Sequence, residues 1–277
     1  MNPTPKIIAL DLDGTMLTYD KQITPRTYAA LEQAAAQGHY IVPATGRALH
    51  ALPDAVKALP FVHYVITING ACVSSTDTGE KLLRCEIDRD RALEIIDYAK
   101  HYDCMYDCYW NDAGWSERAF LERIDYYNQD EAVKKLILQT RRPVDDLAAK
   151  VRTEMDTVQK VQLCFREITE RNTAWTDFTA AFPDIAATAS FQNNLELNHK
   201  MATKGNALRF LARMLKVDLR DTIAFGDSSN DLAMLHTAGV GVAMGNASES
   251  VRAACKAVTA ANDADGVAVY LEQHVLA

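Results

Sequence analysis

The stretch IIALDLDGTML at residues 7–17 decides the fold, because it reads as a buried strand that ends in two acidic residues. The apolar residues Ile7 to Leu10 lead directly to Asp11 and Asp13, and a Gly-Thr pair follows. Burying a carboxylate without a partner costs roughly several kcal/mol. We therefore expect a cation or a proton beside this pair.

The composition is that of an ordinary globular protein. The chain has 277 residues, 48% of them hydrophobic and 24% charged, which fits one large domain or two modest ones. The net charge of -8 argues against a general nucleic-acid binder or membrane-surface binder, which would present a basic face. An anionic ligand is still compatible, because a divalent cation and one lysine reverse the sign locally.

No stretch is apolar enough to read as a signal peptide or a membrane span, so we expect a cytoplasmic protein. The six cysteines are too sparse for a disulfide framework. Cys104 and Cys108 lie near His101, but the spacing matches no zinc pattern. We expect free thiols.

Strand and helix patterns alternate at both ends of the chain. Thr24 and Pro25 are a good N-cap and first residue for a helix that Gly38 ends. The last third continues this alternation from a helical pattern after residue 203 to the C-terminal helix pattern. Such alternation predicts an α/β fold with a Rossmann-like, doubly wound parallel sheet.

The middle of the chain has a different pattern and holds all three tryptophans. We expect residues 1–82 and 190–277 to form the core domain, and residues 83–189 to form an inserted α+β domain. Its candidate strands are KLLRCEI, CMYDCYW, KVQLCFR and IAATASF. Its candidate helices are DRALEIIDYAKHY, VDDLAAKVRTE and ERNTAWTDFTAAF.

Polar residues follow several of the predicted core strands. They are Asp11, Asp13, Thr45, Gly46, Arg47, Asn69, Gly70, Asp227, Asn230 and Asp231. The carboxyl ends of parallel strands meet at one edge of a sheet, where ligands bind. Gathered carboxylate, hydroxyl and amide oxygens suit Mg²⁺ together with a substrate phosphate. The sequence therefore predicts a magnesium site at this edge.

These residues also carry a resemblance. DLDGT at 11–15, ATGR at 44–47, TKG at 203–205 and GDSSND at 226–231 resemble, in order, the four motifs of the haloacid dehalogenase superfamily. INGA at 68–71, VAMGNA at 242–247 and NDADGVA at 262–268 are similar to its Cof-type phosphatases, whose large type IIB α/β cap lies between the second and third motifs. The stretch LELNHKMATKG departs from the usual pattern, and it favours Lys204 over Lys200 as the motif lysine.

The resemblance implies a phosphatase mechanism. Asp11 would be the nucleophile that forms an aspartyl-phosphate, and Asp13 the general acid and base, with a pKa raised relative to that of Asp11. Mg²⁺ would be held by Asp11, the backbone carbonyl of Asp13 and Asp227, with Asp231 supporting these ligands. Phosphate oxygens would be held by the N–H groups of Leu12 and Gly46 and by Thr45, Lys204 and Asn230.

Simpler interpretations remain open for several of these residues. The Thr45 hydroxyl can bond its own turn, and Asn230 can cap the helix after it. Arg47 and Asn69 fit substrate contact and local structure equally.

The resemblance implies small phosphorylated metabolites as substrates, sugar phosphates among them, with the cap selecting the alcohol. The alternatives are a phosphotransferase or phosphomutase of the same superfamily and a non-catalytic phospho-ligand-binding protein. Neither nucleic acid nor a membrane is an expected partner, and we expect a monomer or a small homo-oligomer.

Overall fold

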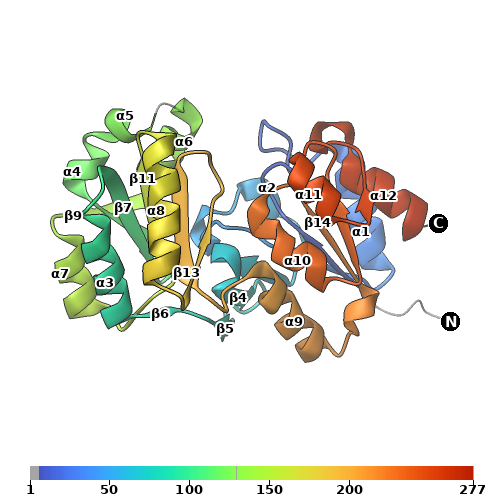
Figure 1. The fold of residues 1–277 in the computed structure, drawn as a ribbon. Helices are drawn as coiled ribbons and strands as arrows, with labels where there is room; N and C mark the ends of the chain where they lie inside the picture. Colours follow the sequence, from blue (N-terminus) through green and yellow to red (C-terminus); the bar gives the residue numbers. More distant parts are fainter. Residues whose placement is uncertain (1–5, 129, 277) are drawn as a thin grey trace. The chain divides into compact units, whose positions relative to one another are not determined.

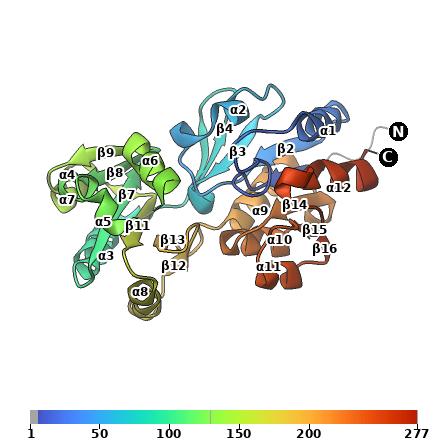
Figure 2. The same cartoon turned by 90° about the horizontal axis from the view of Figure 1, so that it is seen from above.

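The computed structural model describes residues 6–128 and 130–276. It divides into two compact units, drawn in Figures 1 and 2. The core unit comprises residues 6–47, 52–84 and 203–276, and the inserted unit comprises residues 48–51 and 85–202.

The core unit contains a five-stranded parallel sheet. Its strands, in spatial order, are β16 (Ala257–Val258), β15 (Val240–Ala243), β14 (Thr222–Gly226), β1 (Ile7–Leu10) and β2 (Tyr40–Pro43). Strand β1 lies between β14 and β2 and is fully buried, as its apolar sequence predicts, because helices cover both faces of such a sheet. The parallel sheet confirms the predicted fold class.

Helices surround this sheet, and short antiparallel strands extend the unit. The helices are α1 (Pro25–Ala36), α2 (Asp54–Lys57), α9 (Lys204–Leu215), α10 (Leu232–Thr237), α11 (Glu249–Ala254) and α12 (Gly266–His274). The strands β3 (Tyr64–Thr67), β4 (Cys72–Ser75) and β5 (Lys81–Arg84) form a three-stranded sheet. Figure 2 shows α1 beside α12, and the contacts between these two helices agree.

Helix α1 illustrates how the sequence sets local structure. The hydroxyl of Thr24 accepts a hydrogen bond from the backbone N–H of Thr27 at 3.1 Å, and Pro25 is the first helical residue. Beyond the helix, Gly38 has a φ of 88°, which a residue with a side chain rarely adopts. The predicted start and end of this helix are therefore confirmed.

The inserted unit is built on a six-stranded sheet. Its strands, in spatial order, are β12 (Ile185–Thr188), β13 (Asn194–His199), β11 (Lys160–Phe165), β7 (Cys104–Trp110), β8 (Ala113–Glu117) and β9 (Arg141–Val144). All neighbours are antiparallel except β8 and β9. A second pair consists of β6 (Ile87–Asp88) and β10 (Thr157–Val158).

In residues 85–128 and 130–202, six helices accompany this sheet. They are α3 (Arg89–Ala99), α4 (Arg118–Leu121), α5 (Ile124–Tyr127), α6 (Glu131–Thr140), α7 (Leu147–Glu154) and α8 (Ile168–Ala181). The main apolar cluster of this unit joins alternate residues of β7, such as Cys104 and Cys108, to side chains of α3, α7 and α8. Figure 1 shows α3 beside α7 in this unit.

The boundaries of the insertion differ from those expected from the sequence. The inserted unit extends to residue 202 rather than 189, because β13 pairs with both β11 and β12 and is thus an interior strand of its sheet. At the other boundary, Lys81–Arg84 pairs with β4 in the core unit, so only the end of KLLRCEI belongs to the insertion. The two ends of the insertion meet, since the Sγ atom of Cys85 lies 3.3 Å from Nδ1 of His199.

Candidate active site

The register of the parallel sheet brings three polar segments together. Leu10, the last residue of β1, pairs with Phe225 of β14 on one side and with Pro43 of β2 on the other. The next residues of each segment therefore emerge at the same sheet edge. Asp11 leaves β1 there, and its backbone N–H donates to the carbonyl of Phe225 at 3.0 Å.

Three carboxylates gather at this edge. Asp11, Asp227 and Asp231 each offer a carboxylate oxygen, and these oxygens lie within 4.8 Å of one another. Asp227 follows β14, and Asp231 closes the short 3₁₀ turn Ser229–Asp231. Asp11 and Asp231 are buried, which makes a nearby positive charge necessary.

Lys204 supplies one such charge. It is the first residue of α9, whose N-cap is Thr203, and its side chain is fully buried. Its Nζ atom donates to Oδ1 of Asp11 and to Oδ1 of Asp231, both at 2.6 Å. Gly70 makes this placement of the helix start possible, because a Cβ there would lie 2.3 Å from the carbonyl oxygen of Thr203.

The pKa values of the cluster reflect its crowding. Burial, together with the charges of Asp231 and Asp227, raises the pKa of Asp11 even though Lys204 lowers it. Burial and the charge of Asp231 raise the pKa of Asp227 to about 6. Burial alone would lower the pKa of Lys204, but the two carboxylates raise it, so this lysine stays charged. One lysine beside three carboxylates leaves an excess of negative charge.

The donor set fits a hard divalent cation. Carboxylate oxygens are the ligands that Mg²⁺ prefers, and such an ion would offset the remaining negative charge. Asp231 is the carboxylate least available as a direct ligand. Its Oδ1 accepts from Lys204, and its Oδ2 accepts the N–H groups of Asp227 and Ser228, both at 3.0 Å. The supporting role of Asp231 beside the metal ligands stays a prediction.

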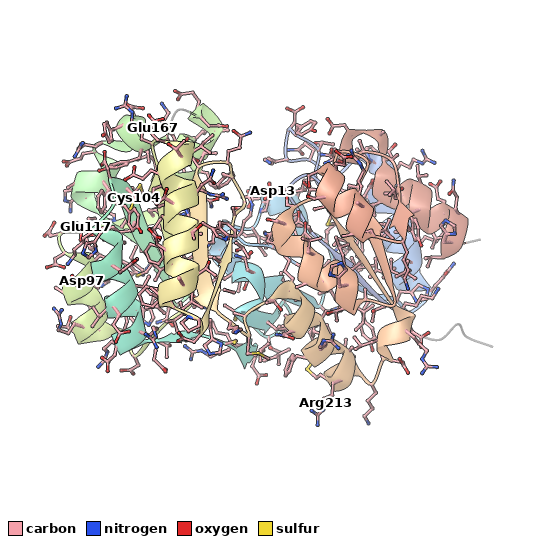
Figure 3. The ribbon with its side chains drawn as sticks, in the orientation of Figure 1. Asp13, Asp97, Cys104, Glu117, Glu167 and Arg213 are labelled. Atoms are coloured by element: carbon pink, nitrogen blue, oxygen red, sulfur yellow. The ribbon has the colours of Figure 1, made fainter. Side chains whose placement is uncertain are left out.

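Asp13 differs from its predicted state. Its carboxylate bonds the guanidinium of Arg47 at 2.7 and 2.8 Å and the ammonium of Lys21 at 2.8 Å. Burial alone would raise the pKa of Asp13, but these two cations lower it to about 2. The expectation that the pKa of Asp13 is raised relative to that of Asp11 is therefore wrong for this conformation. Figure 3 labels Asp13, which lies in the turn after β1.

Thr45 follows β2 and is buried. Its hydroxyl accepts the backbone N–H of Arg47 at 3.1 Å, so the local turn interpretation describes part of its role. Its carbonyl accepts the N–H of Asn69 at 3.0 Å, and Gly46 lies half-buried beside it. Leu12 is fully buried in the turn after β1.

Asn69 and Asn230 meet at the same edge of the sheet. Nδ2 of Asn230 donates to Oδ1 of Asn69 at 3.2 Å. Asn69 adopts a φ of 58°, which asparagine tolerates better than most residues. The Oδ1 atom of Asn230 is buried and has no hydrogen-bond partner among residues 6–128 and 130–276, so an unpaired acceptor is present at the site.

Three neighbours of the acidic residues were not singled out from the sequence. The hydroxyls of Thr15 and Ser228 each donate to a carboxylate oxygen of Asp227 at 3.1 Å. Both residues belong to the motifs DLDGT and GDSSND, so their place in these motifs could have identified them. Lys21 reaches Asp13 from a left-handed turn residue with a φ of 60°, and no spacing rule points to it.

Other candidates lie outside the cluster. Lys200 belongs to the inserted unit, where its ammonium donates to the carbonyl of Pro183 at 3.1 Å. All six cysteines are free thiols, as expected. Cys104 and Cys108 are buried, and Nδ1 of His101 lies 2.9 Å from the carbonyl oxygen of Tyr98.

Comparison with known proteins agrees with this fold. The family model described as haloacid dehalogenase-like hydrolase matches residues 8–271. Phosphatase YwpJ of Bacillus subtilis is 31% identical, over 98% of this chain and all of the relative. Pyridoxal phosphate phosphatase YbhA of Escherichia coli is 26% identical, over 99% of this chain and all of the relative. The solved structure of a haloacid dehalogenase-like hydrolase from B. subtilis has a TM-score of 0.84 at 30% identity, covering 98% of this chain and all of that one.

A parallel sheet with an acidic edge and an inserted α+β unit defines a hydrolase of the haloacid dehalogenase type. The chain belongs to the haloacid dehalogenase-like hydrolases and is of the Cof type. The expectation of an enzyme of the phosphatase class of this family is confirmed. Across residues 6–128 and 130–276, no helix has the length and apolarity needed to cross a membrane.

Proposed function

We propose that this chain is a Mg²⁺-dependent phosphomonoester hydrolase that acts on small phosphorylated metabolites, sugar phosphates foremost, through an aspartyl-phosphate. The observation that carries this proposal is the buried ammonium of Lys204 between Asp11 and Asp231, with Asp227 in the same cluster. The names of relatives support it, one of which is a pyridoxal phosphate phosphatase.

In the first step, a carboxylate oxygen of Asp11 attacks the phosphorus of the monoester. The bond between phosphorus and the alcohol oxygen breaks, and the leaving oxygen takes a proton from Asp13. In the second step, water attacks the phosphorus of the aspartyl-phosphate, and Asp13 accepts the water proton. Phosphate leaves and the Asp11 carboxylate is restored.

The transferring phosphoryl group needs fixed donors around its oxygens. We assign this role to Lys204, Asn230, the hydroxyl of Thr45 and the N–H groups of Leu12 and Gly46.

Asp11, Asp227 and the backbone carbonyl of Asp13 would hold Mg²⁺. When bound, the ion offsets carboxylate charge and stabilises the charge of the phosphoryl oxygens.

Asp13 is a carboxylate in the conformation described here, because Arg47 and Lys21 pair with it. That state suits the second step, in which Asp13 accepts a proton. To donate a proton in the first step, Asp13 must separate from at least one of these cations. The ion pairs with Arg47 and Lys21 therefore form part of the proposed cycle.

The test is a screen of phosphorylated metabolites for phosphate release, with Mg²⁺ and with a chelator. The Asp11→Asn variant keeps the shape of the side chain but replaces the nucleophilic carboxylate by a neutral amide, so we expect no phosphate release. Acid quenching with labelled substrate should leave label on the wild-type protein and none on the variant. Equal turnover by the variant would rule out Asp11 as the nucleophile.

The same assay separates the alternatives. A phosphotransferase would pass phosphate to an added alcohol such as glycerol, and free phosphate would then fall short of the ester consumed. A non-catalytic phospho-ligand-binding protein would release no phosphate from any ester in the screen.

A further inference from the structure

Two asparagines far along the chain hold the turn that carries Asp13. This turn, residues 12–17, follows β1. Nδ2 of Asn246 donates to the carbonyl oxygen of Gly14 at 2.8 Å, and Nδ2 of Asn262 donates to the carbonyl oxygen of Leu17 at 2.8 Å. These two bonds hold the carbonyl groups of Gly14 and Leu17, which lie in the first and second half of the turn.

The two asparagines are also bonded to each other. The backbone N–H of Asn262 donates to Oδ1 of Asn246 at 3.0 Å. The loops that carry them, after β15 and β16, are joined further by a bond from the N–H of Gly245 to the carbonyl of Ala260 at 3.1 Å. Asn246 and Asn262 therefore act as one unit, which we call the asparagine brace.

Asp227 contacts the same turn through different groups. The Gly14 Cα atom approaches this carboxylate so closely that a Cβ would lie 2.6 Å from its Oδ2. The hydroxyl of Thr15 donates to Oδ1 of Asp227 at 3.1 Å. The turn is thus fixed by the brace through its carbonyls and by Asp227 through Gly14 and Thr15.

The burial of Asn262 supports a specific role for its amide. The residue is 4% exposed, and its Oδ1 atom has no hydrogen-bond partner in the described part of the chain. Leaving a buried acceptor unpaired is unfavourable. Asn262 therefore contributes as a donor: its side-chain amide bonds the carbonyl of Leu17, and its backbone N–H bonds Oδ1 of Asn246.

We propose that Asn246 and Asn262 are positioning residues, which hold the turn of residues 12–17 so that Asp13 delivers its proton to the leaving oxygen. This inference rests on the proposed phosphatase function. The side-chain N–H groups of both asparagines bond backbone carbonyls of the turn and not the carboxylate of Asp11 or Asp13. Their effect is the placement of the acid relative to Asp11 and Asp227, and small misplacements of a catalytic group are costly.

The test compares two esters in the Asn246→Ala and Asn262→Ala variants. p-Nitrophenyl phosphate releases a stable phenolate and needs little protonation, whereas pyridoxal 5′-phosphate releases an alkyl alcohol and depends on the acid. We expect kcat/KM for the alkyl ester to fall about 10- to 100-fold, and that for the aryl ester to fall less than about threefold. The double variant should resemble the single ones, because the brace acts as one unit.

Hydrogen exchange gives a readout that is independent of activity. Amides of residues 12–19 should exchange faster in both asparagine variants than in the wild type. Thr259→Val is the matched control, because its hydroxyl bonds the carbonyl of Gly266 at 2.6 Å in the same region without reaching the turn. This control should change neither the exchange of the turn nor the ratio of the two esters.

The inference is overturned if the variants lose activity equally on both esters, lose none, or leave exchange of the turn unchanged. These three outcomes count against the inference when the wild type releases phosphate and the Asp11→Asn variant does not. A wild type that releases phosphate from no ester of the metabolite screen, or an Asp11→Asn variant that is fully active, instead refutes the proposed function.

Discussion

The ammonium of Lys204 lies 2.6 Å from Asp11 and 2.6 Å from Asp231, and all three side chains are buried. This lysine is the first residue of a helix, where the helix dipole disfavours a cation. Two carboxylates outweigh that effect, because charges at this separation interact strongly where water is excluded.

Replacing Lys204 by methionine should leave three carboxylates without their cation. We expect the free energy of unfolding, measured by circular dichroism in chelator, to fall by about 3–5 kcal/mol. Mg²⁺ should restore more stability to this variant than it adds to the wild type, and phosphate release should be lost. Lys200→Met is the control, and similar stability of the two variants would contradict the assignment.

Gly14 and Gly38 allow a matched pair of substitutions. Both have a positive φ, 86° and 88°, so alanine strains either backbone by about 1–2 kcal/mol. A Cβ at Gly14 also meets Asp227 at 2.6 Å, whereas a Cβ at Gly38 meets nothing within 4 Å. We expect Gly14→Ala to raise the Mg²⁺ concentration for half-maximal activity at least about tenfold. Gly38→Ala should leave it unchanged.

The inserted unit contains a buried ion pair between Arg141 and Asp107. Arg141 bonds Asp107 at 2.7 Å, and both side chains are buried. Burial raises the pKa of Asp107, although the charge of Arg141 opposes this. Arg141→Met should destabilise the unit by about 3–5 kcal/mol, because it leaves an unpaired buried acid.

Denaturation followed by tryptophan fluorescence measures this change, since all three tryptophans lie in the inserted unit. The double variant Asp107→Leu/Arg141→Met should recover most of the loss. A single variant as stable as the wild type would show that the pair contributes nothing.

His39 gives the core unit a dependence on pH. The side chain is buried, and Nδ1 accepts the backbone N–H of Lys6 at 3.1 Å. Burial, and then the charge of Lys6, lower the pKa of His39. The folded state therefore favours neutral imidazole, and its stability is complete above the unfolded pKa of about 6.5 and falls as pH drops below it.

His39→Gln removes this titration. Between about pH 7.5 and about pH 5.5, the variant should lose less unfolding free energy than the wild type does. Urea denaturation at each pH measures the difference. Parallel losses in the two proteins would show that His39 does not contribute.

The positions of Asp11, Thr45 and Asp227 were predictable because each lies within two residues of the end of an apolar strand of a parallel sheet. Register alone brings the carboxyl ends of such strands together. The rotamer of Asp13 was not predictable in this way. It depends on Arg47 and on Lys21, which reaches it from a turn without a sequence signal.

The insertion was harder to delimit for a related reason. Strand β13 has the mixed sequence NLELNH, with Glu196 buried against Lys160 at 3.0 Å. A polar pattern of this kind does not read as an interior strand, since its buried charges become acceptable only through partners on another strand. Strands β8 and β9 and helices α4 and α5 were missed as well, because each has only four or five residues. Helix α6 was also missed, although Val133 and Ile137 have helical spacing and are buried.

The contact between Cys85 and His199 means that the chain enters the inserted unit and leaves it at neighbouring points. Such a segment is an insertion whose two ends lie close together. It can be lengthened or trimmed while the parallel strands of the core unit keep their alignment.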